Sequence, residues 1–151
     1  MATISKKAIY ALKALMVLAL NQPRWPLALR EIAEGGHIPL KFLEQIMMGL
    51  RSADLVASQK GPRGGYGLAH AAPEIAVSSV LAAVEGQRFS SQLSGGVDGG
   101  VSGDSRAAAI ERVLREAADS AARVFGAKSL ADLCEDSRAI LAEQRAVMYH
   151  I

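Results

Sequence analysis

Residues 28–69 decide the fold, and their sequence is ALREIAEGGHIPLKFLEQIMMGLRSADLVASQKGPRGGYGLA. A short helix is predicted over residues 28–34, with Gly35-Gly36 as its stop. A further helix is predicted to open at Pro39, because proline favours a first helical turn, and to run to about Ala53. Only four residues separate the two helices, which is typical of a helix-turn-helix. The apolar residues expected on one face of the second helix are Phe42, Leu43, Ile46, Met47 and Leu50.

The end of the same stretch predicts a β-hairpin. Residues 55–59 and 66–69 are expected to be strands, and the glycine- and proline-rich residues 61–65 are expected to be the turn between them. Lys60 and Arg63 make the hairpin tip basic. A phosphate-binding loop would need a Lys-Ser/Thr pair at its end and a helix after it, and neither follows this glycine-rich turn. A helix-turn-helix followed by a hairpin predicts a winged helix.

The flanking segments also favour helices. Ser5 is a suitable cap for a helix over residues 4–21, in which apolar residues recur every three or four positions before Pro23. A short helix is predicted over residues 78–85, ended by Gly86.

The second half begins with a predicted mobile loop, Gln87–Ser105, which contains five glycines and five serines. A long helix is predicted from Asp104 to about Phe125, ended by Gly126. Its apolar residues recur at alternating steps of three and four, which is typical of a coiled-coil seam, and they are Ala107, Ile110, Leu114, Ala117, Ala121 and Val124. Packing of this helix on its own domain is the alternative. Ser129 and Asp132 form the pattern of a capping box that opens a last helix, predicted to continue to Met148.

Length and composition agree with this mainly helical fold with a small β-hairpin. The chain has 151 residues, the usual size of one domain or one domain with an appendage. Its 27 alanines and 7 aromatic residues favour helices and exclude an all-β sandwich. We expect a winged-helix domain over residues 1–86, a flexible loop over 87–103, and a dimerisation helix with a C-terminal helix over 104–151.

Charge differs between the two halves. Residues 1–70 contain nine Lys or Arg and four Asp or Glu, whereas residues 71–151 contain eight and eleven. This asymmetry favours an anionic partner for the first half. Lys13 interrupts the apolar run that follows Lys6 and Lys7, which argues against a signal peptide, and no stretch has the length of a membrane span.

The sequence predicts no catalytic or metal site. His37, His70 and His150 lack further ligands at metal-binding spacing, and a Gly-x-Ser-x-Gly motif is absent. Cys134, the single cysteine, excludes a disulfide within the chain and an all-cysteine metal site in one subunit. We expect it to be a buried structural thiol whose pKa the neighbouring carboxylates raise, and a redox-sensing thiol is the alternative.

Several of these segments together resemble the Rrf-two family of bacterial winged-helix transcription regulators. The resemblance covers residues 1–86 well and 104–133 loosely. The segments that carry it are Ala8–Leu15 in the first helix, Leu29–Glu34 in the second, Leu43–Ile46 with Leu50-Arg51 and Leu55-Val56 around the third, Lys60–Leu68 in the hairpin, and Ser129–Leu133.

The resemblance implies a cytoplasmic homodimer that binds double-stranded DNA and is not an enzyme. Family members that bind an iron–sulfur cluster carry three cysteines in the loop before the long helix, and Gln87–Ser105 has none. We therefore expect a regulator, most simply a repressor, without a cofactor. A small effector or a partner protein, or a thiol switch at Cys134, are the alternatives for sensing.

Residues 39–52 are expected to lie in the major groove. Glu44 is suited to accept from cytosine and Gln45 to pair with adenine, although Glu44 also suits the helix N-terminus as a charge. The expected phosphate or minor-groove contacts are Ser5, Lys6, Lys7, Lys41, Lys60 and Arg63. The expected dimer contacts are Ile110, Leu114, Ala117, Ala121 and Val124.

Overall fold

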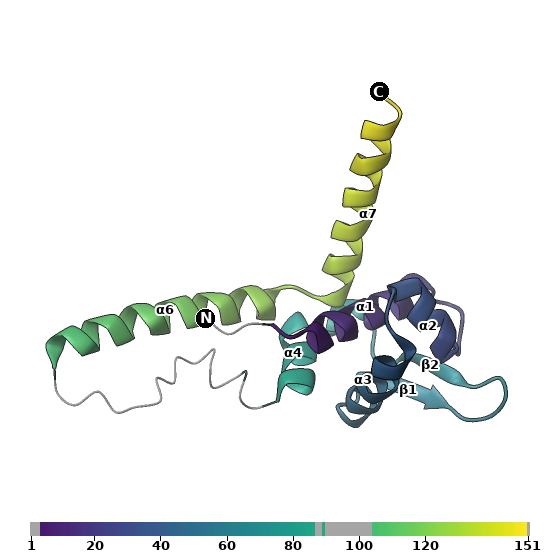
Figure 1. Ribbon diagram of the computed structural model, residues 1–151, viewed down its shortest axis with the longest axis horizontal. Coiled ribbons are helices and arrows are strands. Elements are labelled where there is room, and N and C mark those ends of the chain that lie inside the picture. Colours follow the sequence, from purple (N-terminus) through teal and green to yellow (C-terminus); the bar gives the residue numbers. More distant parts are fainter. Residues whose placement is uncertain (1–3, 87–88, 90–103, 151) are drawn as a thin grey trace.

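The computed structural model, shown in Figure 1, describes residues 4–86, 89 and 104–150. Within these residues the fold is mainly helical and has a single two-stranded antiparallel sheet, as the sequence predicts. The elements in chain order are α1 (Lys6–Leu20), α2 (Leu29–Gly36), α3 (Leu40–Ser52), β1 (Val56–Gln59), β2 (Gly65–Leu68), η1 (Ala72–Glu74), α4 (Val77–Glu85), α6 (Ser105–Ala127) and α7 (Leu130–Met148).

The helix-turn-helix is present, but α2 ends later than predicted. Gly35 and Gly36 form its last turn, and His37 ends the helix in a left-handed conformation with φ of 52°. An added Cβ would lie 3.1 Å from Val17 Cγ1 at Gly35 and 2.7 Å from Ile38 Cδ1 at Gly36. The two glycines therefore serve close packing of α2 against α1 and the turn.

The buried face of α3 is narrower than predicted. Leu43, Ile46, Met47 and Leu50 are at most 1% exposed. Phe42, which we expected on the same face, is 53% exposed. Successive helical residues differ by about 100° around the axis, so Phe42 lies outside the arc that the other four share. Pro39 precedes the first helical residue and does not lie in the first turn.

The hairpin pairs Val56 with Leu68 at one end and Gln59 with Gly65 at the other. Gly65 is therefore the first residue of β2, although it was predicted to lie in the turn. Leu27 extends the sheet by an isolated bridge, because its N–H donates to the Tyr66 carbonyl at 2.9 Å and its carbonyl accepts from the Tyr66 N–H at 2.8 Å.

Helix α1 packs against α2, α3, α4 and α7, and two hydrophobic clusters form around it. The larger cluster joins α1 to the helix-turn-helix through residues such as Leu15, Ile32 and Leu50. The smaller one contains Ala8, Val77, Leu81 and Phe89. The predicted mobile loop, 87–103, lies outside the described residues except for Phe89, which is helical and buried.

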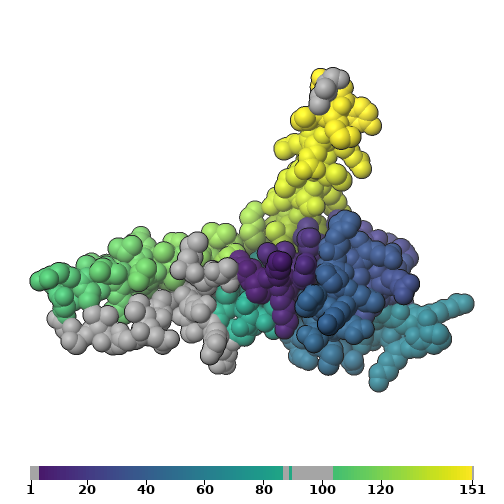
Figure 2. All heavy atoms as spheres, in the orientation of Figure 1, coloured from purple at the N-terminus to yellow at the C-terminus, as the bar shows by residue number. Residues whose placement is uncertain are grey.

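Helices α6 and α7 project from this body in different directions (Figures 1 and 2). None of the 23 residues of α6 is buried. The helix continues past Gly126, which does not adopt the left-handed conformation that would end it. The start of α7 is fixed by the predicted capping box, in which Asp132 N–H donates to Ser129 Oγ at 3.1 Å and Ser129 N–H to Asp132 Oδ2 at 2.8 Å. The bond from the Ser129 N–H is the main reason that the pKa of the Asp132 carboxyl lies below its ordinary value, and the Ser129 side chain lowers it further.

Candidate nucleic-acid interface

The exposed side of α3 carries the three residues that we predicted for this helix. Lys41, Glu44 and Gln45 are all exposed, opposite the buried face. Met48, one turn further along, is 68% exposed and was not predicted. The only feature of the sequence that places Met48 on the exposed face is its position one turn after Glu44, because helical residues four apart are neighbours.

The start of α1 lies beside this face. Ser5 caps the helix as predicted, since its Oγ accepts from the Ala8 N–H at 3.1 Å. The Ser5 N–H donates to Glu85 Oε1 at 3.0 Å, and its hydroxyl donates to the same carboxylate. Both donors of Ser5 are therefore directed to the end of α4, whereas the side chains of Lys6 and Lys7 are exposed.

A hollow of about 390 Å³ lies between α1 and α3. It is lined by Lys6, Lys7, Tyr10, Phe42, Gln45 and Ile46. The structure thus brings Gln45 next to Lys6 and Lys7, two other predicted contact residues that precede it by 39 and 38 positions in the sequence. The lining of the hollow combines two cations with aromatic and aliphatic side chains, a mixture that suits the edge of a nucleic acid.

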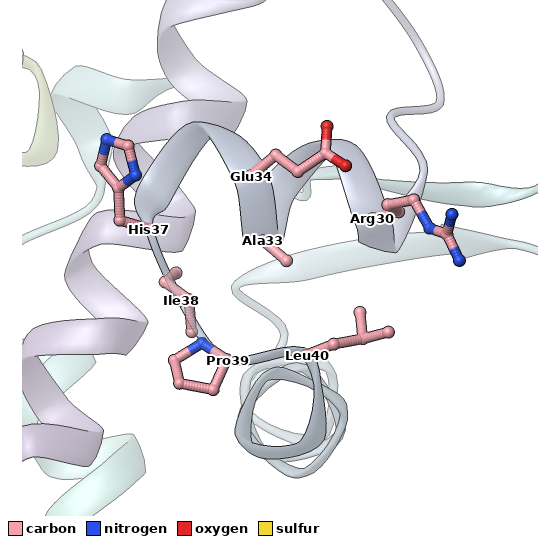
Figure 3. Close-up of a pocket in the computed structure, with 7 residues that line it drawn as sticks. All are labelled: Arg30, Ala33, Glu34, His37, Ile38, Pro39 and Leu40. Carbon is pink, nitrogen blue, oxygen red and sulfur yellow. The ribbon is translucent and has the colours of Figure 1, made fainter.

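A second hollow, of about 420 Å³, lies where α2 turns into α3 (Figure 3). Its lining is Arg30, Ala33, Glu34, His37, Ile38, Pro39 and Leu40. Figure 3 shows Arg30 and His37 at opposite ends of it. Arg30 is an exposed cation in the first helix of the helix-turn-helix, and the sequence analysis did not select it.

The wing is the hairpin of β1 and β2 with the connection between them. It extends beyond the rest of the winged helix, away from α6 (Figure 1). Lys60 and Arg63 are both exposed in the connection between β1 and β2. The predicted basic residues therefore lie in three places: the start of α1, the face of α3 and the wing.

The predicted seam of α6 is largely exposed in the single chain. Ile110 is 63% exposed, Leu114 48% and Val124 59%, and Ala117 is also exposed. Ala121 is half-buried. Val113, which we did not select, extends the same apolar surface and is 65% exposed. The seam is therefore an apolar surface that is exposed to water in the single chain.

Cys134 is only 4% exposed, on the first turns of α7. Burial raises the pKa of its thiol, and Arg138 opposes the shift. The predicted direction of the shift is confirmed, but its cause is burial and not the neighbouring carboxylates. A protonated, buried thiol is a poor nucleophile.

The relatives of this chain are transcriptional regulators. It is 40% identical to the HTH-type transcriptional regulator IscR of Cereibacter sphaeroides over 124 residues, which cover 81% of this chain and 79% of that protein. It is 44% identical to IscR of Vibrio atlanticus over 82 residues, 54% of this chain, and this match spans only about half, 47%, of the Vibrio protein.

A solved structure shares the fold. CymR, the global cysteine regulator of B. subtilis, superposes with a TM-score of 0.76 and 27% identity, over 89% of this chain and 98% of CymR. The winged-helix fold predicted from the sequence is thereby confirmed. Among the residues that the structure describes, no helix is long and apolar enough to cross a membrane.

Residues 4–136 match the Rrf2 family, described as an iron-dependent transcriptional regulator. The donor set does not fit a cysteine-ligated iron site. Over residues 4–86, 89 and 104–150, no three His, Cys, Asp or Glu side chains are placed to hold a metal, and the sequence 87–103 adds only Asp98 to these types. The fold, the basic winged helix and these similarities together show that the chain belongs to the Rrf2 family of DNA-binding transcriptional regulators.

Proposed function

We propose that this regulator binds a specific DNA sequence as a homodimer and represses transcription without an iron–sulfur cluster. The observation that supports the proposal is the exposed polar face of α3, whose Gln45 shares a hollow with Lys6 and Lys7, together with a wing on which Lys60 and Arg63 are exposed. Occupancy of an operator excludes other proteins from the same DNA, which makes repression the simplest outcome. The cytoplasm is the proposed location.

In this proposal α3 lies in the major groove. Glu44 accepts from cytosine N4, and Gln45 pairs with adenine. Lys41 neutralises a phosphate. Lys60 and Arg63 of the wing reach phosphates or the adjacent minor groove.

The start of α1 adds further phosphate contacts through Lys6 and Lys7. Ser5 contributes by capping the helix that presents these two lysines. This role follows from its hydrogen bonds, which are made to Ala8 and Glu85 within the chain.

The seam of α6 supplies the proposed two-fold interface. A symmetric contact requires a self-complementary surface, and the seam of Ile110, Leu114, Ala117, Ala121 and Val124 provides one. Two copies would present two α3 helices, so the operator would be pseudo-palindromic with half-sites spaced by helical turns.

The wing assignment is tested by changing both Lys60 and Arg63 to alanine. Affinity for all DNA sequences should fall, and the plot of log affinity against log salt should become less steep by about 0.9 for each phosphate that the wing no longer neutralises. Changing Arg138 and Arg145 of α7 to alanine is the matched control, because it removes the same charge far from the wing. Unchanged affinity and slope in the wing variant would refute the assignment.

A second candidate function, docking of a partner protein, is favoured by the free end of α7. Ile140 is 54% exposed, Leu141 48%, Val147 65% and Met148 72%. An exposed apolar surface on residues 130–151 is what partner docking requires. Burial of Cys134 and the raised pKa of its thiol, in contrast, support a structural cysteine over a thiol switch.

A further inference from the structure

We propose that Phe42 determines sequence specificity by contacting the methyl group of a thymine in the major groove. This inference rests on the proposed function, in which α3 enters that groove. It adds an apolar contact to the polar ones assigned to Glu44 and Gln45.

Phe42 is exposed on the surface of α3. Its neighbour Leu43 is 0% exposed, whereas the Phe42 side chain lies half in solvent. The core of α3 is already filled by Leu43, Ile46, Met47 and Leu50. The fold therefore leaves the outer part of the Phe42 ring free to meet another molecule.

The hollow between α1 and α3 places Phe42 near charged and polar side chains. Phe42 lines it together with Lys6, Lys7 and Gln45. The two lysines attract a phosphate backbone, and a DNA strand held there presents its base edges to the side chains on α3. In the proposed complex, the exposed ring of Phe42, which shares this hollow with two cations and a base-pairing amide, would face the edge of the base pairs.

The chemical groups exposed in the major groove indicate which base Phe42 contacts. Thymine alone places a methyl group there, and phenylalanine is one of the side chains that contact it. Phe42 and Gln45 are three residues apart and therefore adjacent on the helix. Gln45 suits adenine, and every A·T pair presents an adenine edge and a thymine methyl in the same groove, so the two side chains fit one A·T pair or two neighbouring ones.

The experiment removes the methyl group from the DNA. Binding sites are first selected with the wild-type protein from a random duplex library, and each thymine of the selected site is then replaced singly by deoxyuridine. The affinities of wild type, Phe42→Ala and Phe42→Leu are measured by fluorescence anisotropy. Phe42→Leu retains an apolar contact and serves as the matched control, and thermal melting verifies that both variants fold.

At one thymine in each half-site we expect deoxyuridine to weaken wild-type binding about fourfold, which corresponds to losing the burial of one methyl group. The same replacement should leave the affinity of Phe42→Ala unchanged, and Phe42→Leu should show part of the wild-type effect. If the wild type selects a site but no thymine shows this difference between wild type and Phe42→Ala, the inference is wrong and the proposed function stands. If the wild type selects no site, the proposed function itself fails.

Discussion

Replacing Leu114 of α6 by glutamate tests the proposed dimer most directly. Leu114 is 48% exposed in the single chain, so a partner helix can still bury about half of it. Full burial of a leucine is worth about 1.5–3 kcal/mol, and the remaining half therefore contributes about 1 kcal/mol per subunit. Because each subunit of a two-fold dimer contributes one Leu114, this free energy doubles for the dimer. Two carboxylates placed in the seam without partners would cost at least about as much again.

The expected loss is thus about 4 kcal/mol per dimer, or about a thousandfold in the dissociation constant. The fold of the single chain should survive, because none of the residues of α6 is buried. Ala108→Glu is the matched control, since Ala108 is exposed on the side of α6 opposite the seam. Sedimentation velocity should show a monomer for Leu114→Glu and a dimer for the control.

DNA binding should weaken in parallel, because one subunit contacts only one half-site. Circular dichroism separates dissociation from unfolding, which matters if no stable monomer exists. A folded Leu114→Glu protein that still sediments as a dimer would refute the reasoning and show that the interface lies elsewhere.

Four further predictions concern single residues and bound iron. Gly49→Ala should raise the free energy of unfolding by about 1 kcal/mol, because an added Cβ meets nothing within 4 Å and alanine favours the helix; a lower melting temperature would contradict this. Cys134 should react with a maleimide much more slowly in the folded protein than in urea, and equal rates would show that the thiol is accessible. Protein purified without oxygen should be colourless and free of iron; visible absorption with stoichiometric iron and sulfide would overturn the proposed absence of a cluster. The Asp132 carboxyl, whose pKa lies below its ordinary 3.8, should stabilise the fold above that pH and lose this effect as the pH falls through its lower folded value, so the difference in stability between wild type and Asp132→Ala should shrink in acid. A difference that stays constant down to acid pH would contradict the capping role.

Local sequence patterns were sufficient to predict the helix-turn-helix, the wing and the capping box. Each depends on residues close together in the chain, such as Ser129 and Asp132, so periodicity and turn chemistry carry the information. Gly35 and Gly36 show where local rules fail. The role of Gly35 is set by Val17 of α1, a distant contact that no local pattern contains, and that of Gly36 by the side chain of Ile38 in the turn.

Phe42 shows a second limit of sequence reasoning. Hydrophobicity alone does not distinguish a side chain that fills the core from one that faces a binding partner, and the ring is at the edge of the apolar arc. The bridge between Leu27 and Tyr66 was missed for another reason, since a single paired residue has no alternating pattern. The hollow that joins Lys6 to Gln45 depends on the packing of α1 against α3, which periodicity does not specify.

Helix α1 connects the surface that we propose to face DNA with the second half of the chain. Its first turn presents Lys6 and Lys7, while Ser5 is held by Glu85 at the end of α4. Behind the lysines, Ala8 is buried in the cluster that also contains Phe89, against which Phe125 of α6 packs with 6.2 Å between ring centroids. These packed contacts form a continuous path from α6 to the start of α1, so we expect a change in the position of α6 to shift the start of α1 as well. The same contacts therefore connect the two lysines that we propose for DNA binding with the proposed dimer helix.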